Sequence, residues 1–275
     1  MDQAYVLDRG EREFDRLDLQ GILYRDATRS ALLSAGVSKG MRVLDVGCGS
    51  GDMTRLAADL VGPEGTVLGV DMDAGSIRSA RTRCAQLGIG NVAFQEGEAA
   101  SVAEPHSFDA LVARFFLMHQ PSPGRALADI ARAVRPGGAI VMLESHMAAL
   151  LGGPHSFPHS ELYDAILRWK CRVVASAGAD LEAGLRLYQT FRAAQLPAPE
   201  LRMEAPTGGG RSSLIYRYMA ESMRSMLPMA EKNGIDGFSA ERVDNIEASL
   251  RNEVLANDGV LMCWPVVSAW CRLAD

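Results

Sequence analysis

The sequence predicts an α/β fold built on a doubly wound, mostly parallel β-sheet. From Met41 onward, short apolar runs alternate with amphipathic segments of helical periodicity, and this alternation continues to about Glu144. The apolar runs are nearly continuous, which is typical of strands that helices cover on both faces. Right-handed crossovers between such strands give a doubly wound sheet. A chain of 275 residues, of which 48% are hydrophobic and 23% charged, can bury the large core that this fold needs.

Five strands and three helices make up this alternating region. The strands are predicted at Arg42–Val46, Thr66–Val70, Asn91–Gln95, Phe108–Ala113 and Ala139–Glu144. The helices are predicted at Asp52–Val61, Asp73–Leu87 and Pro123–Val134. In the forty residues before them, leucine, isoleucine and alanine fall mostly at helical spacing, and two glycines mark the end of this helical segment.

Beyond Glu144 the regular alternation stops, and the sequence predicts further helices and two more strands. Glycines and prolines make residues 147–160 a loop. Helices are predicted from about Glu161 to Ala175, from about Asp180 to Gln195, over a stretch ending at Leu227, and over Ser239–Ala256 with Ser239 as the N-cap. Pro197–Pro206 is predicted as the sixth strand and Gly259–Leu273 as the last. Pro265 within the last strand indicates an edge position, a bulge or the beginning of the strand.

Composition and charge exclude several classes of protein. Lys plus Arg total 28 against 34 for Asp plus Glu, and the net charge of −6 argues against a nucleic-acid partner, which needs basic residues to neutralise phosphates. No apolar run approaches the length of a membrane span, and the N-terminus lacks the basic-then-apolar order of a signal peptide. Five cysteines without a Cys-x-x-Cys pair indicate reduced thiols in a cytoplasmic protein, with neither a disulfide framework nor a zinc site.

The segment from Val43 to Asp52 carries the most informative motif. An apolar strand ends in a Gly-x-Gly-x-Gly turn, and a helix begins directly after it. Glycines allow positive φ angles and a close approach of the backbone to a ligand, and the following helix N-terminus favours a negative group. A purely structural turn is the alternative. The dinucleotide fingerprint would place its third glycine where this chain has Asp52, which disfavours an NAD enzyme.

A second acidic position follows the second strand. Asp71 comes twenty residues after Gly51, where a carboxylate can accept hydrogen bonds from ribose hydroxyls. Asp73 fits a helix N-cap better. An acid at the end of the second strand also occurs in NAD enzymes, so this position alone does not identify the cofactor.

These segments resemble motif I and the next motif of the class I S-adenosyl-L-methionine (SAM) dependent methyltransferases. Three later segments fall in the order expected for that family: Phe94–Ala99, Phe108–His119 and Val134–Ala139. The last holds a Pro-Gly-Gly turn entering strand five. The resemblance covers residues 41–145, and within the superfamily it is closest to the bacterial small-molecule group related to the ubiquinone and menaquinone methyltransferases.

The resemblance implies a Rossmann-like, seven-stranded sheet and a set of cofactor-binding residues. The cofactor would be SAM, the product S-adenosyl-L-homocysteine, and no metal would be needed. Asp45 would help hold the ammonium group, and Asp71 the ribose. Glu98, where Asp is commoner, would read the adenine amine. The other implied cofactor contacts are Gly47, Gly49 and Gly51 under the amino-acid end, Met72 against the adenine, the backbone amide near Ala99, and Arg114 in the loop beside the sulfonium.

The same resemblance divides the chain, which we predict to be a single methyltransferase domain over residues 1–275. Residues 1–40 would form an N-terminal helical lid and residues 41–146 the SAM-binding core. Residues 147–257 would supply helical substrate-cap elements with strand six, and residues 258–275 the last strand. The helical insertions would thus follow strand five and precede the last strand.

Two residues are candidates for the proton transfer that accompanies methylation. His119 follows the fourth strand, where ligands of such sheets bind, and only histidine titrates unperturbed near neutral pH. The alternative is a histidine packed at a helix start. Tyr24 lies in the N-terminal helix that folds over the SAM methionine end in similar enzymes, or is a packing residue. His155 and His159 have the i, i+4 spacing of a metal pair, but Pro154 and Pro158 make a helix there unfavourable.

We therefore predict a SAM-dependent methyltransferase that acts on a small aromatic or heterocyclic acceptor in bacterial secondary metabolism. The specific hypothesis is methylation of an indole ring at C3. Alternatives are a small-molecule O-methyltransferase, an NAD-dependent oxidoreductase, and a SAM-binding protein without methyl transfer. The chain lacks the Asn/Asp-Pro-Pro-Tyr and Pro-Cys motifs of nucleic-acid methyltransferases. The partner would be the small-molecule substrate, with no nucleic acid or membrane, and the protein a monomer or homodimer.

Overall fold

A computed structural model describes residues 11–102, 104–153 and 155–274. The signal-peptide prediction, and the first ten residues of the proposed lid, lie outside this part of the chain. Two compact units are distinguished. Unit 2 comprises Tyr24–Ser145, Ala183–Glu204 and the chain from Val266 on. Unit 1 comprises the described residues up to Leu23, His146–Glu182 and Ala205–Pro265. Each unit is described by itself.

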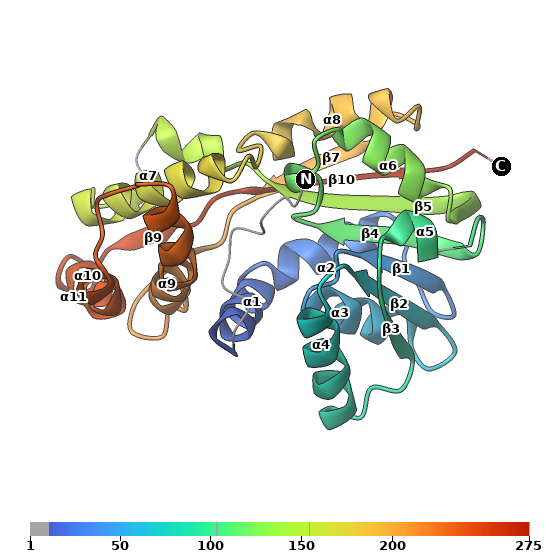
Figure 1. Cartoon of the computed structure of the whole chain (residues 1–275), viewed down its shortest axis with the longest axis horizontal. Helices are drawn as coiled ribbons and strands as arrows, with labels where there is room; N and C mark the ends of the chain where they lie inside the picture. The colour runs from blue at the N-terminus through green and yellow to red at the C-terminus, as the bar shows by residue number, and fades with distance from the viewer. Residues whose placement is uncertain (1–10, 103, 154, 275) are drawn as a thin grey trace. The chain divides into compact units, whose positions relative to one another are not determined.

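Unit 2 contains a seven-stranded sheet with the strand order β3-β2-β1-β4-β5-β10-β7 (Figure 1). The first five strands in this order run parallel, and β10 runs antiparallel to both β5 and β7. The strands are β1 (Arg42–Val46), β2 (Thr66–Asp71), β3 (Val92–Glu96), β4 (Phe108–Arg114), β5 (Val134–Ser145), β7 (Glu200–Glu204) and β10 (Val266–Arg272). The predicted doubly wound, mostly parallel sheet is confirmed.

The helices of unit 2 alternate with these strands along the chain, and two of them share a hydrophobic core with the central strands. Leu44, Leu111 and Ile140 of the central strands pack in one cluster with Leu127 and Phe191 of two of the helices. This arrangement explains why the central strands have nearly continuous apolar sequences. The helices are α2 (Arg25–Ser34), α3 (Asp52–Val61), α4 (Ala74–Gln86), α5 (Ala99–Val102), α6 (Pro123–Ala131) and α8 (Ala183–Ala193), with a 3-10 turn η1 (Leu117–His119).

The bounds of several elements in unit 2 differ from the sequence prediction, and three of these differences have a clear physical reason. β5 begins at Val134, so the Pro-Gly-Gly segment belongs to the strand, and the register with β4 shifts between Phe108 and Ala110. α6 ends at Ala131 because β5 begins so early. α4 begins after Asp73, whose carboxylate accepts a hydrogen bond from the Ser76 amide at 2.7 Å, and this confirms Asp73 as the N-cap.

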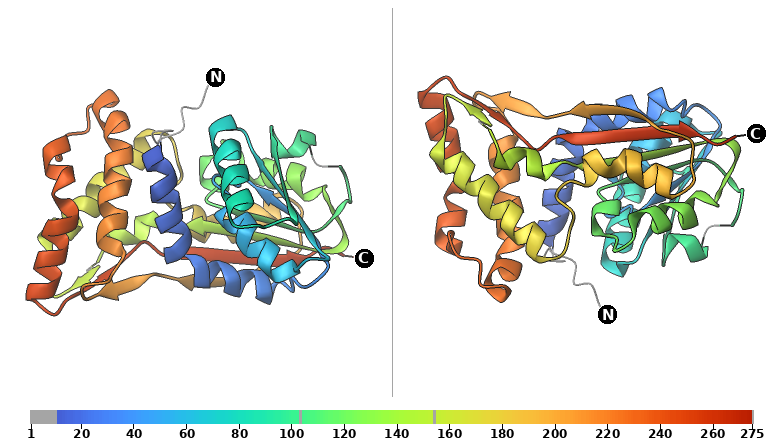
Figure 2. Two further views of the ribbon diagram at one scale, coloured as in Figure 1. Left: turned by 90° about the horizontal axis from the view of Figure 1, so that it is seen from below. Right: turned by 90° about the horizontal axis from the view of Figure 1, so that it is seen from above.

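Unit 1 is mostly helical (Figure 2), and α9 packs against both α1 and α11. Its three-stranded antiparallel sheet has the order β6-β9-β8. The elements are α1 (Glu11–Leu23), η2 (Met147–Leu151), β6 (Ser156–Phe157), α7 (Glu161–Ser176), β8 (Thr207–Gly209), α9 (Ile215–Lys232), α10 (Ala240–Asp244), α11 (Ile246–Ala256) and β9 (Val260–Met262). None of the helices in the described ranges is both long and apolar enough to cross a bilayer.

Two elements that were predicted to be continuous are each divided into two in the structure. The last strand, predicted over Gly259–Leu273, is two strands: β9 belongs to unit 1 and β10 to unit 2. Pro265 lies between them, because a proline has no amide hydrogen to donate to a ladder. The helix predicted over Ser239–Ala256 is likewise divided at Asn245 into α10 and α11, although Ser239 caps α10 as expected.

The N-terminal segment is also divided. α1 belongs to unit 1, whereas α2 belongs to unit 2 and contacts β5, β10 and α3. At three further places the chain leaves unit 2 or returns to it at the same edge of the sheet. β5 ends at Ser145, β10 begins at Val266, which pairs with Ser145, and β7 ends at Glu204, which pairs with Val266. This is the carboxyl edge of the parallel strands, where ligands of doubly wound sheets bind.

Candidate functional site

The glycine turn after β1 has the backbone that the sequence predicts. Gly47, Gly49 and Gly51 have φ angles of 68°, 51° and 79°, in the left-handed region that side chains with a Cβ rarely adopt. A Cβ at Gly51 would lie 3.1 Å from both Ala80 and Phe94, so this position is closely packed as well. The turn therefore presents bare backbone at the carboxyl edge, directly before the N-terminus of α3.

Asp71, at the end of β2, holds this turn in place. Its Oδ2 accepts a hydrogen bond from the Gly49 amide at 2.9 Å, and its Oδ1 accepts one from the Asp73 amide at 2.9 Å. Burial raises the pKa of the Asp71 carboxyl, and the two amides oppose that rise. Met72 beside it is 78% exposed, so its side chain is accessible to a flat apolar group. The structure thus brings Asp71 to the glycine turn, and its implied contact with the ribose remains a prediction.

Asp45 is completely buried within β1, beneath the turn. Its Oδ2 accepts a hydrogen bond from the Thr54 hydroxyl at 2.6 Å, whereas its Oδ1 has no hydrogen-bond partner among the described residues. Burial raises the pKa of Asp45 from 3.8 to about 7. An unsatisfied, buried carboxylate oxygen fits a cationic donor such as an ammonium group. The residues present therefore fit the amino-acid end of SAM.

The segment after β3 is open. Glu98 is exposed, and Ala99, buried, begins the short helix α5, so its backbone amide lies at a helix start. Both residues follow the carboxyl end of β3. β3 pairs with β2, and Asp71 is the last residue of β2. Their implied role in reading the adenine remains a prediction.

Arg114, at the end of β4, is engaged by protein groups. Its guanidinium forms an ion pair with Asp52 and donates a hydrogen bond to the Thr28 hydroxyl at 3.1 Å. It also lies 5.6 Å from the centre of the Phe115 ring. Arg114 thus connects β4 to Asp52 at the start of α3 and to Thr28 of α2. The sequence shows Asp52 only as the residue that replaces the third glycine of the dinucleotide fingerprint, and does not predict this ion pair. A direct contact between Arg114 and SAM remains a prediction.

The turn after β4 depends on a residue whose part in holding that turn the sequence did not predict. Glu144, fully buried in β5, accepts hydrogen bonds from the amides of Phe116 at 3.0 Å, Leu117 at 2.6 Å and Met118 at 3.3 Å. Phe115, just before them, has a φ of 57°, which is strained for an aromatic residue. One carboxylate thus fixes the backbone that leads from Arg114 to His119. An acid ending a buried strand was the available signal.

The two candidate proton-transfer residues both lie at this end of the sheet. His119 is half-buried and ends the 3-10 turn that Glu144 holds, so it does not begin the next long helix. Tyr24 is fully buried and precedes α2, just after the end of α1. Its ring packs edge-on against Phe115, with the ring centres 5.5 Å apart. The structure therefore brings Tyr24 to the turn that carries His119.

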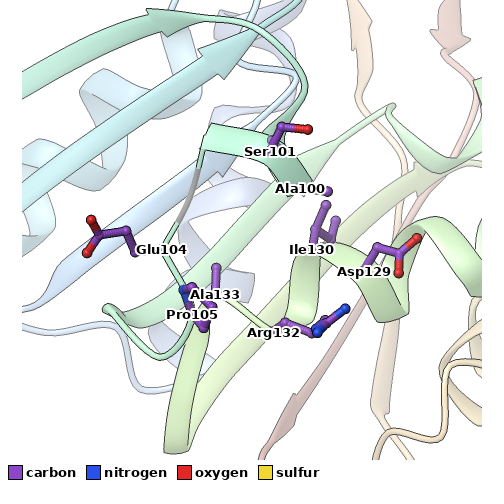
Figure 3. A pocket seen from close by; sticks show the side chains of 9 residues that line it. Ala100, Ser101, Glu104, Pro105, Asp129, Ile130, Arg132 and Ala133 are labelled. Atoms are coloured by element: carbon purple, nitrogen blue, oxygen red, sulfur yellow. The ribbon is translucent and has the colours of Figure 1, made fainter.

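A surface pocket of about 420 Å³ lies elsewhere in unit 2 (Figure 3). Residues of α5 and α6 line it, together with Glu104, Pro105 and Ala133. Pro105 and Ala133 come shortly before β4 and β5, so the pocket is at the amino edge of these strands. Of the predicted cofactor-binding residues, only Ala99 lines it, and we assign it no role in the site.

No group of histidine, cysteine and carboxylate side chains suited to a metal ion occurs in the described ranges. His155 adjoins the two-residue strand β6, and His159 lies beyond it, so the pair is not on a helix, as the flanking prolines predict. The five cysteines are all free and buried.

A family of known proteins, described as a methyltransferase domain, matches residues 37–195 of the chain. The chain is 37% identical over 128 residues to the ubiquinone/menaquinone biosynthesis C-methyltransferase UbiE of Pseudomonas savastanoi pv. phaseolicola. The match covers 46% of this chain and 50% of that protein. The chain therefore spans about half the length of the curated relatives it matches.

Two solved structures share the fold. The YcgJ protein from Bacillus subtilis has a TM-score of 0.57 and 14% identity, covering 91% of this chain and 99% of that one. The Haemonchus contortus phosphoethanolamine N-methyltransferase 2, in complex with S-adenosyl-L-methionine, has a TM-score of 0.53 and 19% identity, covering 91% of this chain and 53% of that one. At these identities the likeness shows the fold alone.

Proposed function

We propose that the chain, which belongs to the methyltransferase domain family, is a SAM-dependent methyltransferase that methylates a ring carbon of a small aromatic or heterocyclic acceptor. The observation that supports this choice is the aromatic end of β4, where Tyr24 packs edge-on against Phe115 beside the turn that carries His119. The name of the UbiE relatives, a C-methyltransferase, supports carbon over oxygen as the methylated atom. Our specific candidate is C3 of an indole, in bacterial secondary metabolism.

The cofactor would lie against the glycine turn. SAM supplies a methyl group that is already activated by the sulfonium. Asp71 would accept hydrogen bonds from the ribose, and the free Oδ1 of Asp45 would accept one from the ammonium group. Glu98 and the Ala99 amide would contact the adenine edge, and exposed Met72 its face. Gly47 and Gly51 would keep the backbone close to the ligand.

The acceptor needs alignment with the methyl group and a base for the proton that leaves its ring. In the transfer the ring carbon would gain a bond to the methyl group as the methyl–sulfur bond breaks, and S-adenosyl-L-homocysteine would leave with the electron pair of that bond. The C–H bond of the ring carbon would then break, with its electron pair returning to the ring and its proton going to a base. His119 would take up that proton, with Tyr24 as a neighbour that orients the acceptor. Glu144 would act through His119 by holding the turn, and is thus a positioning residue.

The helical elements of residues 147–257 are our candidates for acceptor binding, within a single functional methyltransferase domain over residues 1–275. We propose that the protein works in the cytoplasm, where its five free thiols stay reduced, as a monomer or homodimer.

The test is a methyl-transfer assay with indole as the acceptor and SAM labelled with ¹³C in the methyl group. We expect a product in which the labelled methyl group is bonded to a ring carbon. His119→Ala should lower kcat by about 10²–10⁴-fold, the usual contribution of a general base, with SAM affinity nearly unchanged. Tyr24→Phe should cause a smaller loss. The wild-type rate should fall on acidification, because a protonated imidazole cannot accept the proton, and this dependence should disappear in His119→Ala.

The matched control is His106→Ala, since His106 precedes β4 at the opposite end of the strand and contacts the Val134 carbonyl. Its kcat should equal that of the wild type. A labelled methyl group bonded to oxygen or nitrogen of other acceptors would refute carbon methylation. A wild-type kcat in His119→Ala would refute the assignment of His119 as the base.

A further inference from the structure

Unit 1 contains a buried amine that none of the roles above uses. Lys170, in the middle of α7, is fully buried. Its Nζ lies 4.2 Å from the centre of the Trp264 ring and 5.1 Å from that of the Tyr218 ring. Its Nζ donates a hydrogen bond to the Met219 sulfur at 3.7 Å, and a thioether sulfur is a weak acceptor. No described carboxylate forms an ion pair with Lys170.

The titratable and charged groups that face Lys170 come from four segments of unit 1, and none of them is a carboxylate. They are Arg16 from α1, Tyr218 from α9, Cys263 from the segment after β9, and Cys171 on α7 itself. Burial lowers the pKa of Lys170 well below its usual value, and the Arg16 charge lowers it further, whereas the two cysteines oppose this.

The nearby hydroxyl groups are directed elsewhere. The Tyr218 hydroxyl donates to Gln20 Oε1 at 3.3 Å, and Arg16 donates to the same oxygen at 2.8 Å. The Tyr163 hydroxyl donates to the Met262 carbonyl at 3.0 Å. These hydroxyl groups therefore do not serve the Lys170 amine, which contacts two ring faces and a thioether.

This surrounding favours a cation but supplies no anion. The faces of tryptophan and tyrosine attract an ammonium group, and more strongly when water is excluded. An ammonium group without a counter-ion is nevertheless costly to bury, and a hydrophobic residue of similar volume would serve stability as well or better. Stability therefore gives no reason for an amine at this position, and a ligand that brings the missing negative charge does.

We propose that Lys170, with Trp264 and Tyr218, forms a binding site for the carboxylate of a small organic acid. One ammonium matches one singly charged carboxylate, whereas a phosphate would need more donors than this cluster offers. The amine takes up one proton from solvent as the carboxylate binds: an N–H bond forms, and the ammonium and carboxylate then pair. The inference does not require that this acid be the methyl acceptor.

The chain offers a clean way to observe this amine, because it has only three lysines, Lys39, Lys170 and Lys232. Lys39 and Lys232 are exposed and act as internal references. With lysine ¹³C-labelled at Cε, NMR spectra of the full chain would follow each amine during a pH titration. Benzoate, phenylacetate and hexanoate are the probes, and the amide of each is its neutral control.

We expect the carboxylates, and not their amides, to raise the titration midpoint of Lys170 by at least about one pH unit, a tenfold tighter binding to the protonated amine. The reference lysines should not shift. Lys170→Met should lose at least tenfold in carboxylate affinity by calorimetry. Arg172→Met, which removes an exposed cation from the same helix, should bind like the wild type.

Equal affinity of the wild type for the acids and their amides would overturn the proposal, as would unchanged carboxylate affinity in Lys170→Met. If Lys170→Met does not fold, Lys39→Arg and Lys232→Arg assign the signals, and the midpoint shift alone decides. Absence of methyl transfer in the indole assay would leave these readouts unaffected, so the two proposals fail separately.

Discussion

The buried ionisable side chains of the two units differ in whether the protein supplies their hydrogen-bond partners. In unit 2, Glu144 accepts hydrogen bonds from three consecutive amides, and Asp71 accepts them from two. In unit 1, Lys170 has two ring faces and a thioether but no described anionic partner. These two carboxylates of unit 2 are thus satisfied by backbone amides, whereas the buried amine of unit 1 has no comparable partner.

This difference indicates two kinds of site. Carboxylates that hold backbone amides fix the shape of the turns after β1 and β4 before any ligand arrives, which is how a site is preorganised. Asp45 is the exception in unit 2, because one of its oxygens has no described partner. A group left unsatisfied in the folded protein is the place where a ligand is expected to complete the hydrogen bonding.

The largest effect is expected at the glycine turn. Gly49→Val places a β-branched residue at a φ of 51° and points a side chain from the turn, so SAM binding should weaken by more than about a hundredfold. Calorimetric titration with SAM measures this loss. The control is Gly88→Val, which has the same strain at a φ of 66° but open space around its Cβ. Normal SAM binding in Gly49→Val would make the turn purely structural.

Glu144 and Lys170 test the comparison itself. Glu144→Ala leaves buried amides without an acceptor and should lower the free energy of unfolding by about 3 kcal/mol, measured with urea. Glu144→Gln retains an acceptor oxygen and should lose less. Lys170→Met should lose no stability, because no ion pair is broken. A Glu144→Ala protein of wild-type stability but without activity would show that Glu144 contacts the acceptor and does not hold the turn.

The pH dependence of SAM affinity tests Asp45. Its pKa is raised to about 7 in the folded protein, compared with 3.8 in an unfolded chain. Between these two pH values the folded protein therefore holds a proton on Asp45 that the unfolded chain has lost. The free energy of unfolding of the protein without SAM should therefore rise as the pH falls from 7 toward 4. SAM affinity should change in the opposite direction, falling up to about tenfold per pH unit below 7, because the ammonium needs the ionised carboxylate.

Asp45→Asn is the matched variant for this measurement. It should bind SAM more weakly at pH 8 and lose the dependence between pH 5 and pH 7. A wild-type affinity that stays constant over this range would remove Asp45 from the site.

The sheet of unit 2 could be predicted from sequence because its signals are local. Buried parallel strands have continuous apolar runs, and the glycines and Asp73 mark where turns and helices begin. The early start of β5 could not be predicted, because proline and glycine in Val134–Ser145 contradict a strand unless the register shift near Phe108 is known. A strand beginning at Pro265 was one of the alternatives that the sequence left open, whereas the separate strand β9 before it was not predicted.

The parts of the site that could be predicted are those in which the residue type itself indicates the role, such as glycine at a positive φ or a carboxylate at the end of a strand. Three glycines at positive φ and an acid after β2 meet at the carboxyl edge because neighbouring parallel strands end there. The roles of Glu144 and of the Arg114–Asp52 ion pair were not predictable, since each depends on a partner more than 25 residues away in the chain. Lys170 was missed for the same reason, because its ring partners come from other elements.

The most direct test of the central claim, that SAM binds at the glycine turn with its ribose on Asp71, is a calorimetric SAM titration of Asp71→Ala beside Asp73→Ala. Asp71→Ala removes the acceptor for the ribose and for the Gly49 amide, and should weaken binding by about 1–3 kcal/mol, or roughly 5- to 150-fold. Asp73→Ala, two residues on, removes the cap of α4 but leaves the hydrogen bonds from the Gly49 and Asp73 amides to Asp71 in place, and should bind SAM normally. Unchanged SAM affinity in Asp71→Ala would contradict the placement of the cofactor.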